Sequence, residues 1–270
     1  MVVETLWKNR NYLINIPYII ASDIYEYDIR KANINVLRAL NVIDQDYYNK
    51  LNNMSRMERQ VEIGYMIRSD KTLYETLSNG IMNYRRALFD ANNISDDRIV
   101  SIKNDAIFIL GKLSTTRFSN QYNTVEFVEK NHYTSYYKLL NLEFYFLSDI
   151  VSGRLVIDVK GLGDKIELHR NFIGWIAEII SLVETGDLED ALADIQSFYI
   201  EYINRFLDIS FYRELNSESK YAVNTMGNTF LMMALENTQP NKNSLDISYN
   251  LQIIRTLYGY VSQLFLSRRK

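Results

Sequence analysis

The chain has 270 residues, of which 47% are hydrophobic, and its net charge is −3. This length can bury one large core or two smaller ones, while 10 Gly and 2 Pro are too few for a turn-rich all-β protein. The absence of Cys excludes disulfides and thiolate metal sites, and the acidic balance is unusual for a free-standing nucleic-acid-binding protein.

Strands and helices are mixed in the first part of the chain. The pattern predicts a strand at 24–29, helices at 31–40, 45–53, 55–68 and 71–92, and two strands within 98–110. Asp44 is a candidate cap for the helix at 45–53, and Asn79-Gly80 is expected to weaken the continuity of the helix at 71–92. A tight turn is expected at Lys103-Asn104, because Asn tolerates positive φ.

The second part changes from strands to helices near residue 160. Residues 123–160 have a strand pattern, whereas apolar residues recur at helical spacing over 168–183, 188–206 after Asp187, and 246–268. We therefore predict an α+β fold with a mixed domain at 1–160, which includes a small helical region at about 41–92, and a helical domain at 161–270.

The setting of the protein is predicted from what the sequence lacks. No apolar run reaches the length of a membrane span, and the N-terminal residues do not have the layout of a signal peptide. We expect a cytoplasmic protein with no membrane partner. Abundant Tyr, Asn, Ile and Lys are typical of AT-rich coding, which many phages have, so a phage protein in the host cytoplasm is expected.

Asp28 and Asp105 are the candidates for chemistry. Asp28 ends the strand in YDIRKANINVL (27–37), and Asp105 follows the turn in SIKNDAIFI (101–109). Two-metal phosphoryl transfer requires carboxylates on neighbouring strands to hold Mg²⁺ or Mn²⁺. Simpler interpretations stay open, since Asp28 can cap the next helix and Asp105 can be a plain hairpin residue beside a strand where an unpaired carboxylate is costly.

These two segments resemble, in order, the first and third palm motifs of family B DNA polymerases. Residues 125–146 and GRLVIDVKGLGD (153–164) are similar to the strands that lead to the thumb of that family, and residues 187–207 resemble its thumb. The resemblance covers residues 25–215. It implies a polymerase-like palm, an antiparallel sheet with helices, followed by an all-α thumb-like region. It also implies nucleotidyl transfer to a primer 3′ end, with Asp28 and Asp105 as catalytic metal ligands.

The resemblance also assigns residues to the nucleotide, with departures from the family pattern. Arg56 or Arg59 would meet the triphosphate. Asn33 stands where the family has a sugar-discriminating Tyr, and Lys103 stands where it has the first Asp of the hairpin. The replacement at Asn33 affects sugar discrimination, and the replacement at Lys103 leaves Asp105 as the metal-binding Asp of the hairpin.

Contacts with the nucleic acid are implied further along the chain. Tyr145 and Lys160 fall at positions that would contact the primer–template, although the basic-aromatic element around Tyr145 lacks its Lys. The helices at 163–215 would grip the duplex. A more ordinary interpretation of aromatic residues at strand and helix spacing is packing in the core.

The arginines also have an ordinary interpretation. Arg56 and Arg59 can form a solvated ion-pair face with Glu58 and Glu62, and Arg85-Arg86 are expected at the surface.

Two functions follow, with a third possibility. The chain is a minimal family B-like polymerase, or the polymerase module of a split enzyme, with primer–template nucleic acid as its partner. Alternatively it is a catalytically inactive palm-fold phage protein that binds a phage or host protein. The pair Asp28 and Asp105 favours the first; the net acidity, Asn33, Lys103 and the missing Lys favour the second. An unrelated α+β phage protein is the third.

Overall fold

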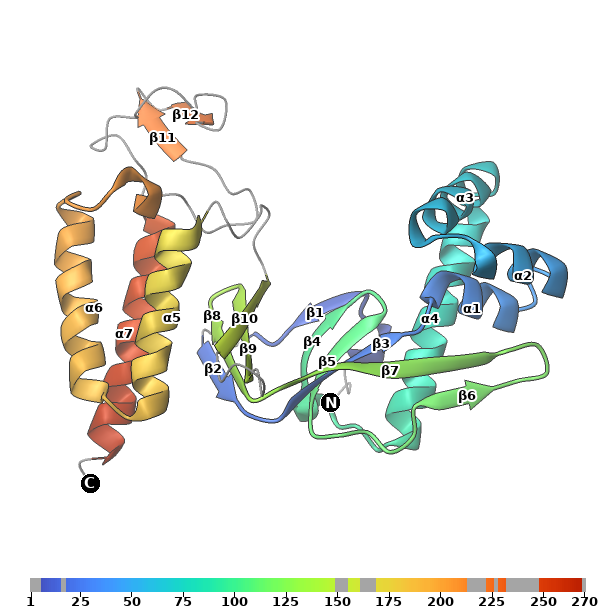
Figure 1. Cartoon of the computed structure of the whole chain (residues 1–270), viewed down its shortest axis with the longest axis horizontal. Helices are drawn as coiled ribbons and strands as arrows, with labels where there is room; N and C mark the ends of the chain where they lie inside the picture. The colour runs from blue at the N-terminus through green and yellow to red at the C-terminus, as the bar shows by residue number, and fades with distance from the viewer. Residues whose placement is uncertain are drawn as a thin grey trace, which may run out of the picture. The chain divides into compact units, whose positions relative to one another are not determined.

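The computed structural model describes residues 6–15, 18–148, 155–160, 169–212, 222–225, 228–231 and 248–268. Their elements are, in chain order, η1 (Leu6–Lys8), β1 (Asn11–Leu13), β2 (Tyr18–Ala21), β3 (Ile24–Ile29), α1 (Ala32–Ala39), α2 (Gln45–Asn53), α3 (Arg56–Ser69), α4 (Thr72–Ala91), η2 (Asp96–Arg98), β4 (Ile99–Lys103), β5 (Ala106–Leu110), β6 (Arg117–Ser119), β7 (Thr124–Tyr133), β8 (Ser135–Leu139), β9 (Leu142–Ser148), β10 (Leu155–Lys160), α5 (Arg170–Thr185), α6 (Leu188–Ile203), η4 (Ile209–Tyr212), β11 (Ala222–Thr225), β12 (Asn228–Leu231) and α7 (Ser248–Arg268). The α+β class is as predicted (Figure 1).

The chain divides into two compact units that interleave along the sequence. The first holds β1, β3 to β7 and α1 to α4, and the second holds β2, β8, most of β9 and β10, and α5 to α7 with the pair β11–β12. A division into domains at residue 160 stays a prediction. None of the helices that the structure describes combines the length and apolar character needed to cross a membrane.

The first unit is built on a six-stranded sheet in the order β1-β4-β5-β3-β7-β6, with antiparallel neighbours. Alternation along β3 separates its two faces, because successive side chains of a strand point to opposite sides. Tyr25, Tyr27 and Ile29 join the core that also contains Val36 and Leu37 of α1. Glu26 and Asp28 therefore point to the opposite face.

Local sequence signals account for the helices of the first unit. Asp44 caps α2 as predicted, accepting a hydrogen bond from Tyr47 N at 2.8 Å. Ser55 and Glu58 form a capping box at the start of α3. Asp28 does not cap α1, whose N-cap residue is Lys31 in the left-handed conformation, so the capping interpretation of Asp28 is wrong.

Helix α4 is continuous through Asn79-Gly80, contrary to the weakening expected from the sequence. A Cβ on Gly80 would lie 2.6 Å from Val36 Cγ1 and 2.7 Å from Leu40 Cδ1. The glycine therefore permits the close approach of α4 to α1, and this tertiary packing offsets its low helix propensity.

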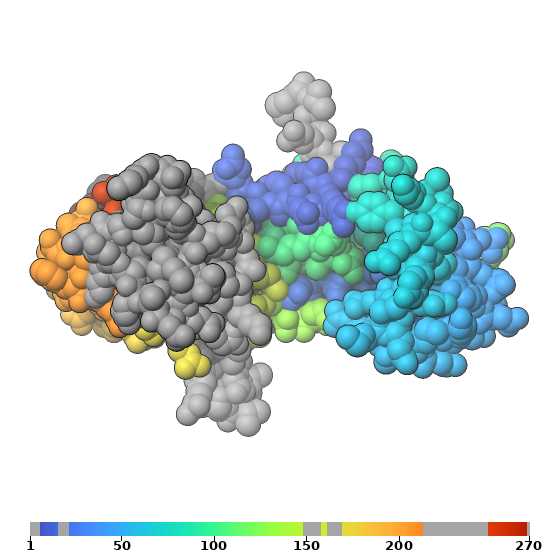
Figure 2. Space-filling model, turned by 90° about the horizontal axis from the view of Figure 1, so that it is seen from above, coloured from blue at the N-terminus to red at the C-terminus, as the bar shows by residue number. Residues whose placement is uncertain are grey.

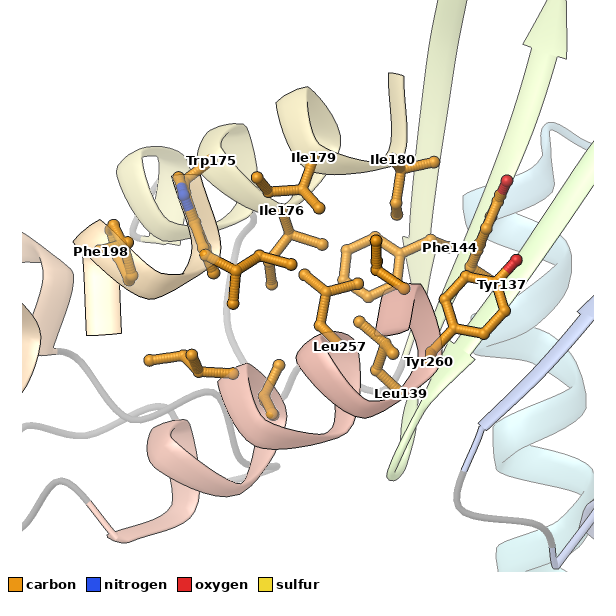
Figure 3. Close-up of a cluster of buried hydrophobic side chains, with 14 of the residues drawn as sticks. Tyr137, Leu139, Phe144, Trp175, Ile176, Ile179, Ile180, Phe198, Leu257 and Tyr260 are labelled. Atoms are coloured by element: carbon orange, nitrogen blue, oxygen red, sulfur yellow. The ribbon is translucent and has the colours of Figure 1, made fainter. Parts of the chain in front are cut away.

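The second unit has its own hydrophobic core. Three helices, α5, α6 and α7, lie side by side (Figure 1), and their apolar faces pack with side chains of β8 and β9 such as Tyr137, Leu139 and Phe144 (Figure 3). Trp175 of α5 stacks on Phe198 of α6 with ring centroids 3.7 Å apart. The four-stranded sheet of this unit has the order β10-β9-β8-β2. Asp187 is the N-cap residue of α6, but its side chain accepts no capping hydrogen bond.

Candidate functional site: two carboxylates in a basic pocket

Asp28 lies on β3 and Asp105 lies in the turn that leads into the adjacent strand β5, at one end of the first sheet. Asp28 is the penultimate residue of β3, where it pairs in register with Ala106, the first residue of β5. Asp105 immediately precedes Ala106 in the β4–β5 turn, where Asn104 has a φ of 55° as the sequence predicts. The fold thus brings together two carboxylates that are separated by 77 positions in the sequence.

The two carboxylates interact strongly. Burial, the negative charge of Asp105 and a hydrogen bond with Asp105 raise the pKa of Asp28 to about 6, and Lys130 partly opposes this rise. Asp28 Oδ1 is buried and has no hydrogen-bond partner among the described residues. A buried oxygen atom without a partner, next to a second carboxylate, is a costly arrangement that a bound cation would relieve.

A cavity of about 280 Å³ opens beside this pair, and we call it the Asp28 pocket. Its charged and amide side chains are Asp28, Lys31, Asn33, Arg56, Arg59, Gln60, Asp105 and Lys130. Four basic residues therefore face two acidic ones. Such a pocket is suited to an anionic ligand, and more so when divalent cations are bound to the carboxylates.

The two predicted arginines enter the pocket from α3. Their acidic neighbours on that helix are engaged elsewhere: Glu58 accepts from Ser55 N, and Glu62 accepts from Tyr47 and Lys50. Arg59 also donates to the Met54 carbonyl at 3.3 Å. The ion-pair face is therefore not the arrangement observed for these two glutamates.

Lys31 and Lys130 also line the pocket, and sequence reasoning did not assign them. Lys31 follows Asp28 closely in the same segment and donates to Asn52 Oδ1 at 2.6 Å. Lys130 lies where β3 and β7 change register, since Tyr27 pairs with Glu129 and Glu26 with Asn131. This bulge gives β7 an extra residue opposite Glu26 and Tyr27, and the Lys130 side chain lines the Asp28 pocket. The spacing of VEFVEKNHY does not reveal a bulge, so only the strand pairing identifies Lys130.

Asn33 and Lys103 occupy different surroundings. Asn33, in the first turn of α1, lines both the Asp28 pocket and a second cavity of about 270 Å³ that also reaches Asp105. Lys103 ends β4, pairs in register with Asn11 and Ala106, and is not among the residues that line the Asp28 pocket.

Arg85 is fully buried, at 1% exposure, contrary to the surface position expected from the sequence. Its guanidinium donates to the carbonyls of Trp7, Asn9 and Asn104. Arg86 has the expected surface position and pairs with Asp90 at 3.6 Å. The sequence did not distinguish these neighbours because the partners of Arg85 are backbone groups distant along the chain.

Tyr145 and Lys160 belong to the second unit. The Tyr145 ring is fully buried and its hydroxyl donates to Glu143 Oε1 at 2.6 Å. A ring without exposed surface cannot stack on a base, so the predicted nucleic-acid contact of Tyr145 is not compatible with its burial. Lys160 pairs with Asp158 at 2.9 Å and lies over the Tyr145 ring.

The donor set of the Asp28 pocket fits a hard divalent cation. Mg²⁺ and Mn²⁺ prefer oxygen ligands, and Mg²⁺ commonly takes one or two carboxylates and keeps several waters. Within the described part of the chain, no group of three or more His, Asp or Glu gathers around a common point. Asp28 and Asp105 would thus supply the protein ligands, and a bound substrate or water the remainder.

Comparison with known proteins identifies the family. The fold and site define an α+β protein with paired carboxylates at the end of an antiparallel sheet, in a pocket rich in basic residues. A family model described as "Bacteriophage PBS1 gene 130 protein" matches residues 1–261, so the chain belongs to this phage protein family. No curated protein matches the chain.

Proposed function

We propose that the first unit is the catalytic palm of a minimal family B-like polymerase, or of the polymerase module of a split enzyme. The juxtaposition of Asp28 and Asp105 is the observation that carries this proposal. Asp28 and Asp105 would hold Mg²⁺ or Mn²⁺, which supplies a Lewis acid for phosphoryl transfer to a primer 3′ hydroxyl.

The other residues of the pocket have roles in this proposal. Arg56 and Arg59 approach from α3 and would bind the triphosphate, with Lys31 and Lys130 adding positive charge on the palm side. Asn33 would lie beside the sugar. The phage family is compatible with a role in copying phage nucleic acid, and primer–template would be the partner.

A second candidate function is a palm-fold phage protein that has lost catalysis and binds a phage or host protein. Lys103 favours it, because a basic residue stands where the resembled family has an acidic one. Asn33 favours it too, because an amide replaces the Tyr that selects the sugar.

Primer extension with Mg²⁺ or Mn²⁺ tests the proposal directly. Wild type should extend a primer. Asp105→Asn should lower the rate by about 10³-fold, since removal of a metal ligand forfeits several kcal/mol of transition-state stabilisation. Asp97→Asn, which changes an exposed acid outside the pocket, is the matched control and should extend as wild type does.

Two outcomes would reject the catalytic assignment. Extension by Asp105→Asn at the wild-type rate would show that another site is responsible. Wild type that neither extends a primer nor binds Mn²⁺, with or without added primer–template at low salt, would favour the inactive alternative.

A further inference from the structure

Asn104 is held at three separate points. Its backbone N–H donates to the Arg10 carbonyl at 2.9 Å, its side-chain Oδ1 accepts from Arg10 Nε at 2.7 Å, and its own carbonyl accepts from Arg85. Asn104 is the residue directly before Asp105. A turn residue held at its N–H, its carbonyl and its side-chain oxygen restricts the orientations of the neighbouring Asp105 side chain.

Arg85 of α4 also holds this turn. It extends from α4 and binds the carbonyls of Trp7 and Asn9 in addition to that of Asn104, so one guanidinium joins a helix, the N-terminal segment and the turn. Figure 2 shows the N-terminal residues, in dark blue, beside the turquoise residues of the α4 region. No Lys side chain has the fork of donors needed for three such carbonyls.

The burial of the Arg85 guanidinium lowers the stability of the folded state. Its partners among the described residues are neutral carbonyls, its Nε has no partner there, and burial lowers its pKa to about 10. It still carries its charge at neutral pH, and Asp105 favours that charge. Because the buried Arg85 charge costs stability, its presence is consistent with a role in fixing the geometry of the Asn104 turn.

We propose, on the basis of the function proposed above, that Arg10 and Arg85 clamp Asn104 and thereby position Asp105 as a metal ligand. Arg85 is a positioning residue that acts on the backbone of the turn, and Arg10 is its solvent-exposed counterpart, stacked on Tyr74 at 5.1 Å. Neither arginine lines the Asp28 pocket, but both line the second cavity, which also reaches Asp105, so they would act on a metal in the Asp28 pocket through Asp105 and its turn.

Two measurements on Arg85→Lys test the clamp, with Arg86→Lys as the matched control on the next residue. Mn²⁺ affinity, followed by electron paramagnetic resonance, should fall by about tenfold or more in Arg85→Lys, the usual effect of removing a group that orients a metal ligand. Hydrogen exchange of residues 99–110 should quicken. Arg86→Lys should match wild type in both measurements.

A second pair of variants tests the clamp in case Arg85→Lys does not fold. Arg10→Ala removes an exposed side chain, and Asn104→Gly removes the Oδ1 acceptor while tolerating the positive φ of this position. Both should remain folded by circular dichroism. Both should bind Mn²⁺ more weakly than wild type and show faster exchange in the turn.

The outcomes separate the clamp from the function on which it depends. If wild type binds Mn²⁺, Asp105→Asn does not, and the clamp variants bind as wild type does, the clamp is overturned and the function stands. If wild type binds no Mn²⁺, the proposed metal site fails. Hydrogen exchange of the turn then tests the clamp independently of metal binding. Unchanged exchange in Arg85→Lys and Arg10→Ala overturns the clamp.

Discussion

Asp28 has a raised pKa because it is partly buried beside Asp105, and the direction of this rise has a consequence for stability. The folded state binds the proton more tightly than the unfolded state, whose Asp pKa is near 3.8. The stabilising contribution of protonated Asp28 is therefore fully present below about pH 3.8 and is lost as the pH rises through about 6. At neutral pH, the charged carboxylate opposes folding in the absence of a cation.

Replacement of this residue should stabilise the protein. In EDTA at about pH 7.5, Asp28→Asn should raise the free energy of unfolding by about 1 kcal/mol, a value reduced for solvent screening because the side chain is partly exposed. At about pH 4.5 the gain should largely disappear, because Asp28 is then protonated in the folded wild type. Urea titrations at the two pH values measure both differences.

Asp70 provides a control because its pKa is shifted in the opposite direction to that of Asp28. Hydrogen bonds from the Thr72 side chain and backbone lower the pKa of Asp70, so its favourable contribution is present above its unfolded pKa and is lost only at strongly acidic pH. Asp70→Asn should thus be less stable than wild type by the same amount at both pH values. A pH-independent gain for Asp28→Asn would contradict the electrostatic explanation.

Some residues of the Asp28 pocket could be predicted from the sequence, and others could not. Asp28 and Asp105 were selected from their positions at the end of a strand and after a turn, and Arg56, Arg59 and Asn33 from ordered resemblance; the structure brings all five around the Asp28 pocket. Lys130 was missed because a bulge, a property of strand pairing, decides its place. Their chemical roles stay predictions.

At the scale of elements, α4 shows how packing overrides propensity. Gly80 faces Val36, which is fully buried and stiff, and Leu40, which is partly exposed. An added methyl group gains helix propensity but requires Val36 or α1 to shift. Gly64 in α3 has no atom within 4 Å of an added Cβ.

Substitutions of these two glycines by Ala should have opposite effects. Gly80→Ala should lower the free energy of unfolding by about 1–3 kcal/mol through overpacking. Gly64→Ala should raise it by about 0.5–1 kcal/mol, because only the helix propensity changes. Urea unfolding monitored by circular dichroism measures both. A stabilised Gly80→Ala would show that α1 and α4 are not in close contact.

Elements defined by local signals were predictable, and elements defined by distant contacts were not. The strand Ile24–Ile29 and the helix Gln45–Asn53 follow from alternation and from the Asp44 cap, and both occur as predicted. The strand order and the burial of Arg85 depend on residues far apart in the sequence. No local pattern in YRRALF distinguishes a buried arginine from an exposed one.

At the scale of the whole chain, the two units have separate hydrophobic cores, and each contains one of the two Trp residues. Trp7 packs against the core of the first unit, with Arg86 over its ring at 5.3 Å. Trp175 is buried in the core of the second, where its Nε1 donates to Asp194 at 3.2 Å. Tryptophan fluorescence can therefore report on each unit in the intact chain.

Variants with a single Trp should show that the cores respond separately. Trp175→Phe leaves Trp7 as the reporter of the first unit, and Trp7→Phe leaves Trp175 as the reporter of the second. When Gly80→Ala is added to each, the urea midpoint reported by Trp7 should fall, while that reported by Trp175 should stay nearly unchanged. Separate cores are expected to unfold in separate transitions.

The reciprocal perturbation completes the test. Ile179→Ala creates a cavity in the core of α5 to α7, where this side chain is fully buried, and should cost about 2–5 kcal/mol in the transition reported by Trp175. Trp7 should report little change. If either substitution shifts both reporters equally, the chain unfolds as one cooperative body, and a change in the helical core would then also destabilise the carboxylate site.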